Sequence, residues 1–190
     1  IVGMSVEEDV AFGPGNLGLA PSEIRGRVGA ALETVGMLRL AKRAPHSLSG
    51  GEKRLVAIAG VLAMRPAYLI LDEPTSYLDP AGRERVLNVL WDLRREGISV
   101  IHVTHSMEEI AEADRVVVMS DGRILRDGAP RDVFREADVL RAVGLATPQV
   151  TELMGRLRDR GCGVRPDVLS VDEALREITA LLGQATGGSR

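Results

Sequence analysis

Paired carboxylates and a histidine stand at the ends of two apolar segments of the sequence. Asp72 and Glu73 directly follow the apolar run at residues 68–71, and His105 follows a second run. Because ligands bind beyond the carboxyl ends of strands in open parallel sheets, these side chains are expected at one ligand site. Asp72 is the candidate ligand of a hydrated Mg²⁺. Glu73 is the candidate general base that would orient and deprotonate a water molecule.

Each of these residues also has a structural alternative. Solvated acids often end a strand, and a histidine at a strand end more often has a structural role. Pro74 disfavours the helical region for the residue before it, so Glu73 is predicted to have an extended backbone.

The second candidate site is the stretch LSGGEKR at residues 48–54. Ser49 and Glu52 have the spacing of a capping box, which predicts the start of a helix. A cap does not require two glycines, whereas Gly50 and Gly51 would let a backbone or a phosphate approach closely. Because a helix N-terminus also favours negative charge, both capping and phosphate binding are expected here.

The usual phosphate-binding loop, G-x-x-x-x-G-K-[ST], does not occur in the 190 residues. The lysines of the chain, Lys42 and Lys53, do not follow a glycine. The sequence therefore contains part of a phosphate site without the loop that normally wraps the phosphates.

Hydrophobic periodicity and turn residues predict the elements that position these candidates. A capping box at Ser5–Glu8 predicts a short helix that breaks at residues 13–16. Further helices are predicted from Pro21 to a stop at Gly36 and at 52–64, 81–95 and 107–113. Strands are predicted at 68–71, 98–103 and 115–119, the last followed by an Asp-Gly hairpin with a partner strand to residue 126. This order is typical of an α/β fold with a mostly parallel sheet.

Composition excludes several classes of protein. The net charge of -3 gives no support for nucleic-acid binding. The single cysteine, Cys162, excludes an internal disulfide framework. No apolar run in the sequence approaches the roughly 18 residues of a membrane span.

Four segments in fixed order, LSGGEK, LILDEP, SYLDP and VTH, closely resemble the ATP-binding cassette (ABC) family. In that resemblance residues 48–53 are the signature motif and 68–73 the Walker B strand. Glu73 matches the catalytic glutamate, and His105 matches the switch histidine that senses the γ-phosphate. The stretch 76–79, with Ser76 and Asp79, matches the D-loop. Tyr77 departs from the family pattern, which usually has a small residue there.

The resemblance implies a partial P-loop NTPase-like cassette that uses ATP and Mg²⁺. Two cassettes pair head to tail, so Ser49, Gly50, Gly51 and Glu52 would contact ATP held by a second ATPase subunit. The P-loop and Q-loop of the family lie upstream of the signature motif. The natural polypeptide is therefore expected to begin before Ile1, and this chain alone is expected to be inactive.

The flanking stretches SVEEDVAFGPGNLGL and ATPQVTELMGRLRDRG are similar to those of energy-coupling-factor ATPases, which energise uptake of cobalt, nickel or vitamins. This implies transmembrane partner subunits, a peripheral location at the cytoplasmic face of the membrane, and no nucleic-acid partner. The expected divisions are a helical signature subdomain at 1–65, an α/β part at 66–130, a helical extension at 131–182 and a disordered tail at 183–190.

Two alternatives remain within the wider family. One is an ATPase of another importer class, and the other is a cassette protein without a transport role. A DNA-repair cassette would usually carry a long coiled coil, and a translation-associated one would usually have two cassettes in one chain. A catalytically dead module would be expected to lack Glu73 or His105, and both are present.

Overall fold

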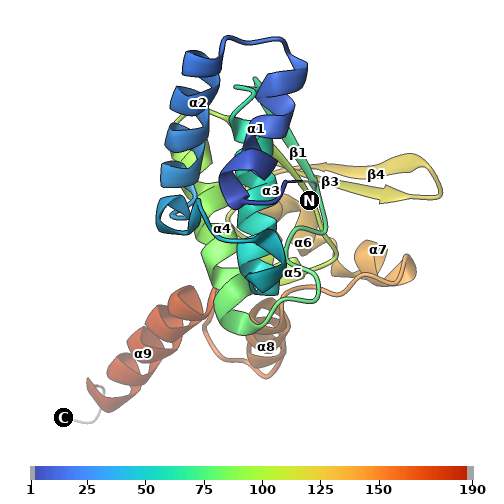
Figure 1. Cartoon of the computed structure of the whole chain (residues 1–190). Helices are drawn as coiled ribbons and strands as arrows, with labels where there is room; N and C mark the ends of the chain where they lie inside the picture. Colours follow the sequence, from blue (N-terminus) through green and yellow to red (C-terminus); the bar gives the residue numbers. More distant parts are fainter. Residues whose placement is uncertain (1–2, 188–190) are drawn as a thin grey trace. The chain divides into compact units, whose positions relative to one another are not determined.

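The computed structural model describes residues 3–187 of the 190-residue chain, without the side chains of residues 138 and 184–187 (Figure 1). The chain divides into two units, Ile1–Val103 and Thr104–Arg190. This division differs from the expected boundaries at residues 66 and 131. It differs because one hydrophobic core joins the first helices to the first two strands.

The first two helices start and stop at signals present in the sequence. α1 (Val6–Asn16) begins at a capping box. The Ser5 side chain accepts the backbone N–H of Glu8, and the Glu8 side chain accepts the backbone N–H of Ser5. α2 (Pro21–Thr34) has proline in its first turn, where no backbone N–H is needed. The chain leaves α2 at Gly36, whose φ of +68° favours glycine.

The predicted break of α1 at residues 13–16 is wrong, because the helix continues through Pro14 to its end. Pro14 is buried, as are Val10 and Val6, which lie one and two turns earlier on the same face. Packing of this face therefore maintains the helix although proline removes one hydrogen bond.

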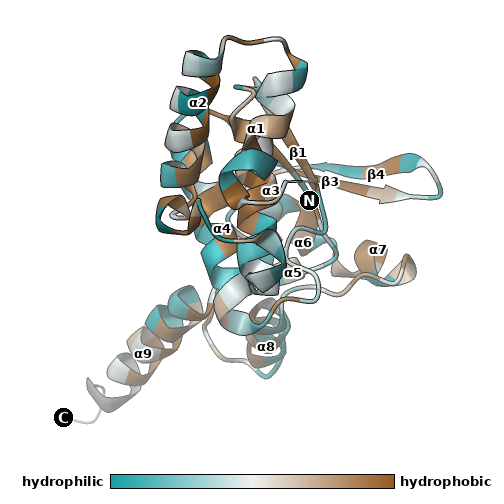
Figure 2. Ribbon diagram, viewed as in Figure 1, coloured by the Kyte–Doolittle hydropathy of each residue, from teal (hydrophilic) through white to brown (hydrophobic). Residues whose placement is uncertain are grey.

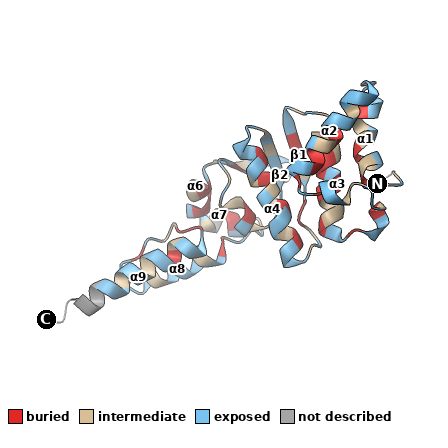
Figure 3. Cartoon of the chain, turned by 60° about the vertical axis from the view of Figure 1, so that its left-hand side comes forward, coloured by how far each residue is buried: buried red, intermediate tan, exposed pale blue. Residues whose placement is uncertain are grey.

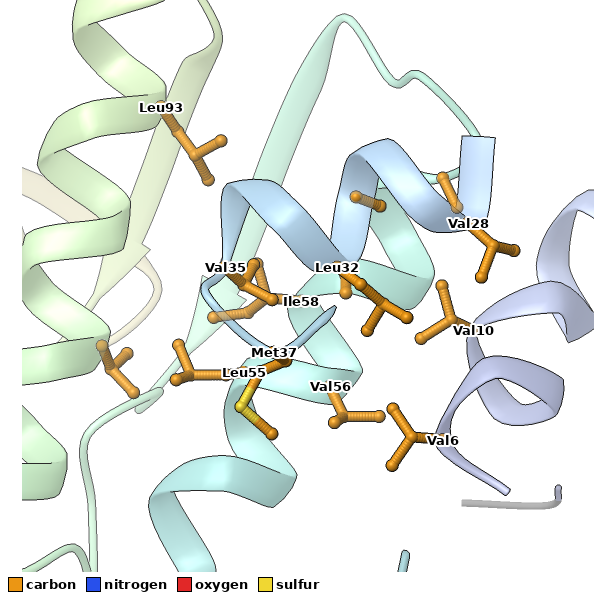
Figure 4. Packing of buried hydrophobic residues seen from close by; sticks show 14 of the residues in the cluster. Val6, Val10, Val28, Leu32, Val35, Met37, Leu55, Val56, Ile58 and Leu93 are labelled. Carbon is orange, nitrogen blue, oxygen red and sulfur yellow. The ribbon is translucent and has the colours of Figure 1, made fainter. Parts of the chain in front are cut away.

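α3 (Gly50–Leu62) follows two short 3₁₀ turns, Leu38–Leu40 and Pro45–Ser47. Its apolar side packs against α1 and α2, and buried residues line the junction of the three helices (Figure 3). Figure 4 shows side chains of this core from all three helices: Val6, Val10, Val28, Leu32, Leu55, Val56 and Ile58.

Two parallel strands complete the first unit. β1 (Tyr68–Asp72) and β2 (Ser99–Val103) pair in register from the first residue of each strand to the last. α4 (Pro80–Arg95) connects them and buries Val86, Leu90 and Leu93 in the core. Gly97, with φ of +89°, lies between the end of α4 and the start of β2.

The strand pair buries only one of its faces among the described residues. Leu69 is 1% exposed, whereas Tyr68 and Ile70 are 68% and 66% exposed. The other face of β1 is thus exposed, although the run at residues 68–71 is apolar on both faces. The apolar run, brown in Figure 2, is compatible with a strand buried on one face as well as with a strand buried on both, because strand side chains alternate between faces.

The second unit contains an antiparallel hairpin, β3 (Val116–Ser120) and β4 (Arg123–Gly128). Asp121 and Gly122 form its turn with φ of +50° and +72°, which are the positive values that a tight hairpin turn of this type requires. The parallel pairing expected from the order of elements is present between β1 and β2. β3 pairs with β4 instead, because the two-residue turn returns the chain antiparallel.

Short helices flank the hairpin: α5 (Met107–Ile110), α6 (Pro130–Arg135) and α7 (Ala137–Ala142). α5 is shorter than the predicted helix at 107–113. A core of Val116, Val118, Val133, Phe134, Leu140 and Leu169 joins α6 and α7 to the inner face of the hairpin.

The helical extension consists of α8 (Gln149–Asp159) and α9 (Val171–Gly187). Arg135 of α6 pairs with Asp167 at 3.1 Å, and this hydrogen bond lowers the pKa of the Asp167 carboxyl below its ordinary value. The tail predicted to be disordered from residue 183 is helical as far as 187, and 188–190 lie outside the described residues. No helix in the described part of the chain has the length and apolar character of a membrane span.

Candidate functional site

The glycine-rich stretch 48–54 forms the start of α3, as the sequence predicts. Ser49 is the N-cap: its side chain accepts the N–H of Glu52 at 3.3 Å, and the Glu52 carboxylate accepts the N–H of Ser49 at 2.8 Å. Hydrogen bonds from the backbone and the side chain of Ser49 to the Glu52 carboxylate, with smaller effects of Arg85 and Arg43, lower the pKa of Glu52 below its ordinary value. Ser49 and Gly50 are exposed, so this helix start faces solvent.

The two glycines of this stretch have different surroundings. A Cβ added to Gly51 would lie 3.1 Å from the Cα of Gly82 in α4, closer than about nine in ten such contacts in proteins. A Cβ on Gly50 would meet only the side chain of Leu78, at an ordinary 3.5 Å. The two glycines were expected to allow close approach of a backbone or a phosphate. At Gly51 the group that approaches closely is the backbone of α4. Gly50 has no such close backbone neighbour and is exposed.

The carboxylates lie where β1 and β2 end together. Asp72 is the last residue of β1, opposite Val103, and is exposed. The N–H of Glu73 donates to the Val103 carbonyl at 2.9 Å. Parallel pairing thus places both carboxylates at the carboxyl end of the sheet, as predicted.

The backbone of Glu73 is not extended, so that prediction is wrong. Its φ is +47°, in the left-handed region that non-glycine residues rarely adopt. The residue begins a turn in which its carbonyl accepts the N–H of Ser76 at 3.2 Å. A left-handed residue here costs of order 1–3 kcal/mol and persists only where surrounding bonds hold it.

The Ser76 hydroxyl holds the Glu73 side chain, donating to its Oε2 at 2.7 Å. Sequence reasoning named both residues but did not foresee this bond. Three residues further on, Asp79 caps α4 by accepting the Gly82 N–H at 3.0 Å. Tyr77, between them, has φ of +62° and is fully exposed.

Within the first unit, α4 therefore links the glycine-rich stretch 48–54 to the segment that carries Glu73 and Asp79. Gly51, from the stretch 48–54, packs on Gly82, and Gly82 is held by the Asp79 cap of the segment that contacts Glu73. Gly82 was missed by sequence reasoning. A glycine in the first turns of an otherwise ordinary helix lowers helix propensity, and this could have marked it as a site of close packing. His105 is exposed and belongs to the second unit, two residues beyond the end of β2.

The described residues contain no group of three or more His, Cys, Asp and Glu side chains placed to hold a metal ion. A single exposed carboxylate, Asp72, fits a cation that keeps most of its water shell, which is the usual behaviour of Mg²⁺. It does not fit a metal held by protein ligands alone.

Comparison with protein families gives a match to the ABC transporter model over residues 2–76. The chain is 55% identical over 180 residues to a cobalt import ATP-binding protein, CbiO, of Syntrophus aciditrophicus, covering 95% of this chain and 64% of the relative. It is 52% identical over 179 residues to the energy-coupling factor transporter ATP-binding protein EcfA1 of Caldanaerobacter subterraneus, covering 94% and 65%. The chain thus spans slightly less than two thirds of the length of these relatives.

Two solved structures that match this chain are also described as parts of ABC transporters. cbiO1 of Clostridium perfringens, described as part of the ABC transporter complex cbiONQ, matches with a TM-score of 0.65 and 44% identity over 80% of this chain and 61% of that one. A putative metal-chelate type ABC transporter in an inward-facing conformation matches with a TM-score of 0.66 and 28% identity, covering 73% and 57%.

Proposed function

We propose that the chain belongs to the ABC transporter family, whose model it matches over residues 2–76, and that it supplies the signature, Walker B, D-loop and switch residues of an ATP-hydrolysing subunit. One observation carries the proposal. Glu73 stands at the shared end of two parallel strands, with its carboxylate held by Ser76 of the D-loop. The same D-loop caps the helix on which the signature motif packs.

In this proposal Glu73 orients and deprotonates the attacking water, a role worth roughly 10²–10⁴ in rate. The Ser76 hydroxyl fixes the direction of its carboxylate. Asp72 would hold Mg²⁺ through its water shell, and the ion would supply charge neutralisation for the phosphates. The matched residue His105 would contact the γ-phosphate.

The signature residues act on nucleotide held by another subunit. Gly50 and Gly51 are the first residues of α3, and their N–H groups have no acceptor within the helix. These N–H groups, with the Ser49 side chain, would face the γ-phosphate, because a helix start favours negative charge. Glu52 is committed to the Ser49 cap and would act by holding the helix start.

The relatives favour a subunit of the energy-coupling-factor type over another importer class or a cassette without a transport role. Their names describe cobalt import and energy-coupling factor transport. We propose that this chain pairs with a second ATPase subunit and works at the cytoplasmic face of the membrane beside transmembrane subunits. Its cargo would be a metal ion such as cobalt or nickel, or a vitamin.

The first test concerns nucleotide binding by the 190-residue chain. A complete cassette, meaning this chain continuous with a P-loop segment, should bind labelled ATP in equilibrium dialysis. The 190-residue chain should not, because its sequence does not contain the P-loop motif, whose lysine and amide nest hold the β- and γ-phosphates. Similar micromolar affinity of both proteins would contradict the proposed division of the ATP site.

The second test concerns partners. The complete cassette should sediment with membranes only when its transmembrane subunits are co-expressed, because attachment would depend on those subunits. Vesicles of anionic lipid without protein are the control, since a basic amphipathic surface would bind them directly. Tight binding to these vesicles would argue against attachment through partner subunits.

A further inference from the structure

A chain of two hydrogen bonds closes the loop that carries His105. The N–H of Ser106 donates to Thr104 Oγ1 at 3.0 Å. The Thr104 hydroxyl in turn donates to Glu109 Oε2 at 3.1 Å. His105 lies between the two residues that the first bond joins, so the backbone on both sides of it is held.

Glu109 is a buried carboxylate in α5. It is 4% exposed, although it lies in a four-residue helix whose neighbouring residue Glu108 is exposed. A carboxylate loses much of its hydration when it is buried, so its position needs a compensating bond. The Thr104 hydroxyl supplies one such bond.

The Glu109 carboxylate orients the Thr104 hydroxyl, which threonine alone would leave free to rotate. Threonine side chains often bond to a nearby backbone N–H without any further partner. Their hydroxyl group rotates, however, and can donate as well as accept. By accepting the hydroxyl hydrogen, Glu109 leaves the lone pairs of Thr104 Oγ1 to the Ser106 N–H.

We propose that Glu109 is a positioning residue for His105: through Thr104 it fixes the backbone that directs the imidazole to the γ-phosphate. The inference rests on the proposed function, because it assumes that His105 acts on nucleotide. Glu109 itself is buried and acts through the loop.

The structural part is tested in the chain itself by hydrogen exchange of the Ser106 amide, followed by NMR. Thr104→Val removes the hydroxyl and keeps the shape, so the fold should persist while Ser106 exchange accelerates at least about tenfold. Thr104→Ser restores a hydroxyl and should return exchange to within about twofold of the wild type. Glu109→Ala should resemble Thr104→Val. Unchanged Ser106 exchange in Thr104→Val would overturn the inference.

The functional part is tested by ATP hydrolysis in the complete cassette. Thr104→Val and Glu109→Ala should each lower kcat about tenfold with little change in KM, because the contact of His105 with the γ-phosphate would matter mainly in the transition state. The double variant should be no slower than either single one, since both changes break the same chain of bonds. Thr104→Ser should restore kcat.

Failure of this inference differs from failure of the proposed function. If the wild type hydrolyses ATP, Glu73→Gln does not, and Thr104→Val is as fast as the wild type, only the inference is overturned. Additive losses in the double variant, or a rise in KM alone, would overturn it as well. A wild-type complete cassette without ATPase activity would overturn the proposed function, and the inference with it.

Discussion

Glu73→Gln in the complete cassette should abolish nearly all ATP turnover while leaving ATP binding intact. Glutamine has almost the same shape as glutamate but is not basic, so a loss of roughly 10²–10⁴ in kcat is expected for a missing general base. The geometry should survive, because the amide oxygen of glutamine can still accept the Ser76 hydroxyl, which donates to Glu73 Oε2 at 2.7 Å. Phosphate release under single-turnover conditions measures the rate, and equilibrium dialysis measures binding.

Glu96→Gln is the matched control for this experiment. Glu96 follows the end of α4 and is exposed, so the same chemical change there should leave kcat unaltered. A fall of less than about tenfold in Glu73→Gln would argue against Glu73 as the base.

Gly51→Ala should destabilise the first unit, although alanine is the better helix former. The new Cβ would lie 3.1 Å from the Cα of Gly82, which is backbone and cannot rotate away. Overpacking of this kind typically costs about 1–3 kcal/mol. Because α3 must move away from α4, the signature motif should also shift relative to the D-loop, and ATP hydrolysis in the complete cassette should fall.

Gly26→Ala provides a control with the opposite expected sign. Gly26 is exposed in the middle of α2, and a Cβ added there would have no neighbour within 4 Å. The substitution should therefore stabilise the protein by about 0.4–1 kcal/mol. Urea unfolding followed by the fluorescence of Trp91, the single tryptophan, reports on the first unit because Trp91 lies in α4. Equal shifts of the midpoint in both variants would refute the close approach of α3 and α4.

Local signals in the sequence predicted the elements that depend on local chemistry. The capping box of Ser49 and Glu52 starts α3, Gly36 follows α2, and Asp121-Gly122 forms the hairpin turn. Each of these depends on the backbone preferences of a few adjacent residues. The placement of Asp72 and Glu73 at the end of paired strands followed from strand order alone.

Features that depend on distant contacts were not predictable in the same way. Pro14 reads as a helix breaker, yet α1 continues through it because its apolar face is buried. Glutamate is a residue type that is mostly exposed, yet Glu109 is buried and accepts the Thr104 hydroxyl. In both cases tertiary packing outweighs the local preference.

The candidate site likewise has features that the sequence predicts and features that depend on the folded structure. The residue types and order identified Glu73, but the rule for residues before proline predicted an extended backbone where the structure has φ of +47°. The turn closed by Ser76 sets that angle, and this turn is a property of the folded segment rather than of the Glu-Pro pair.

The left-handed backbone at Glu73 also bears on which variants of this protein selection would retain. Glycine takes this conformation without penalty and asparagine with little, so either would suit residue 73 better than glutamate on folding grounds alone. Among random variants screened only for folded protein, residue 73 should therefore drift toward glycine or asparagine. Under a screen that also demands turnover, glutamate should persist. Position 73 is thus a place where fitness for folding and fitness for catalysis favour different amino acids.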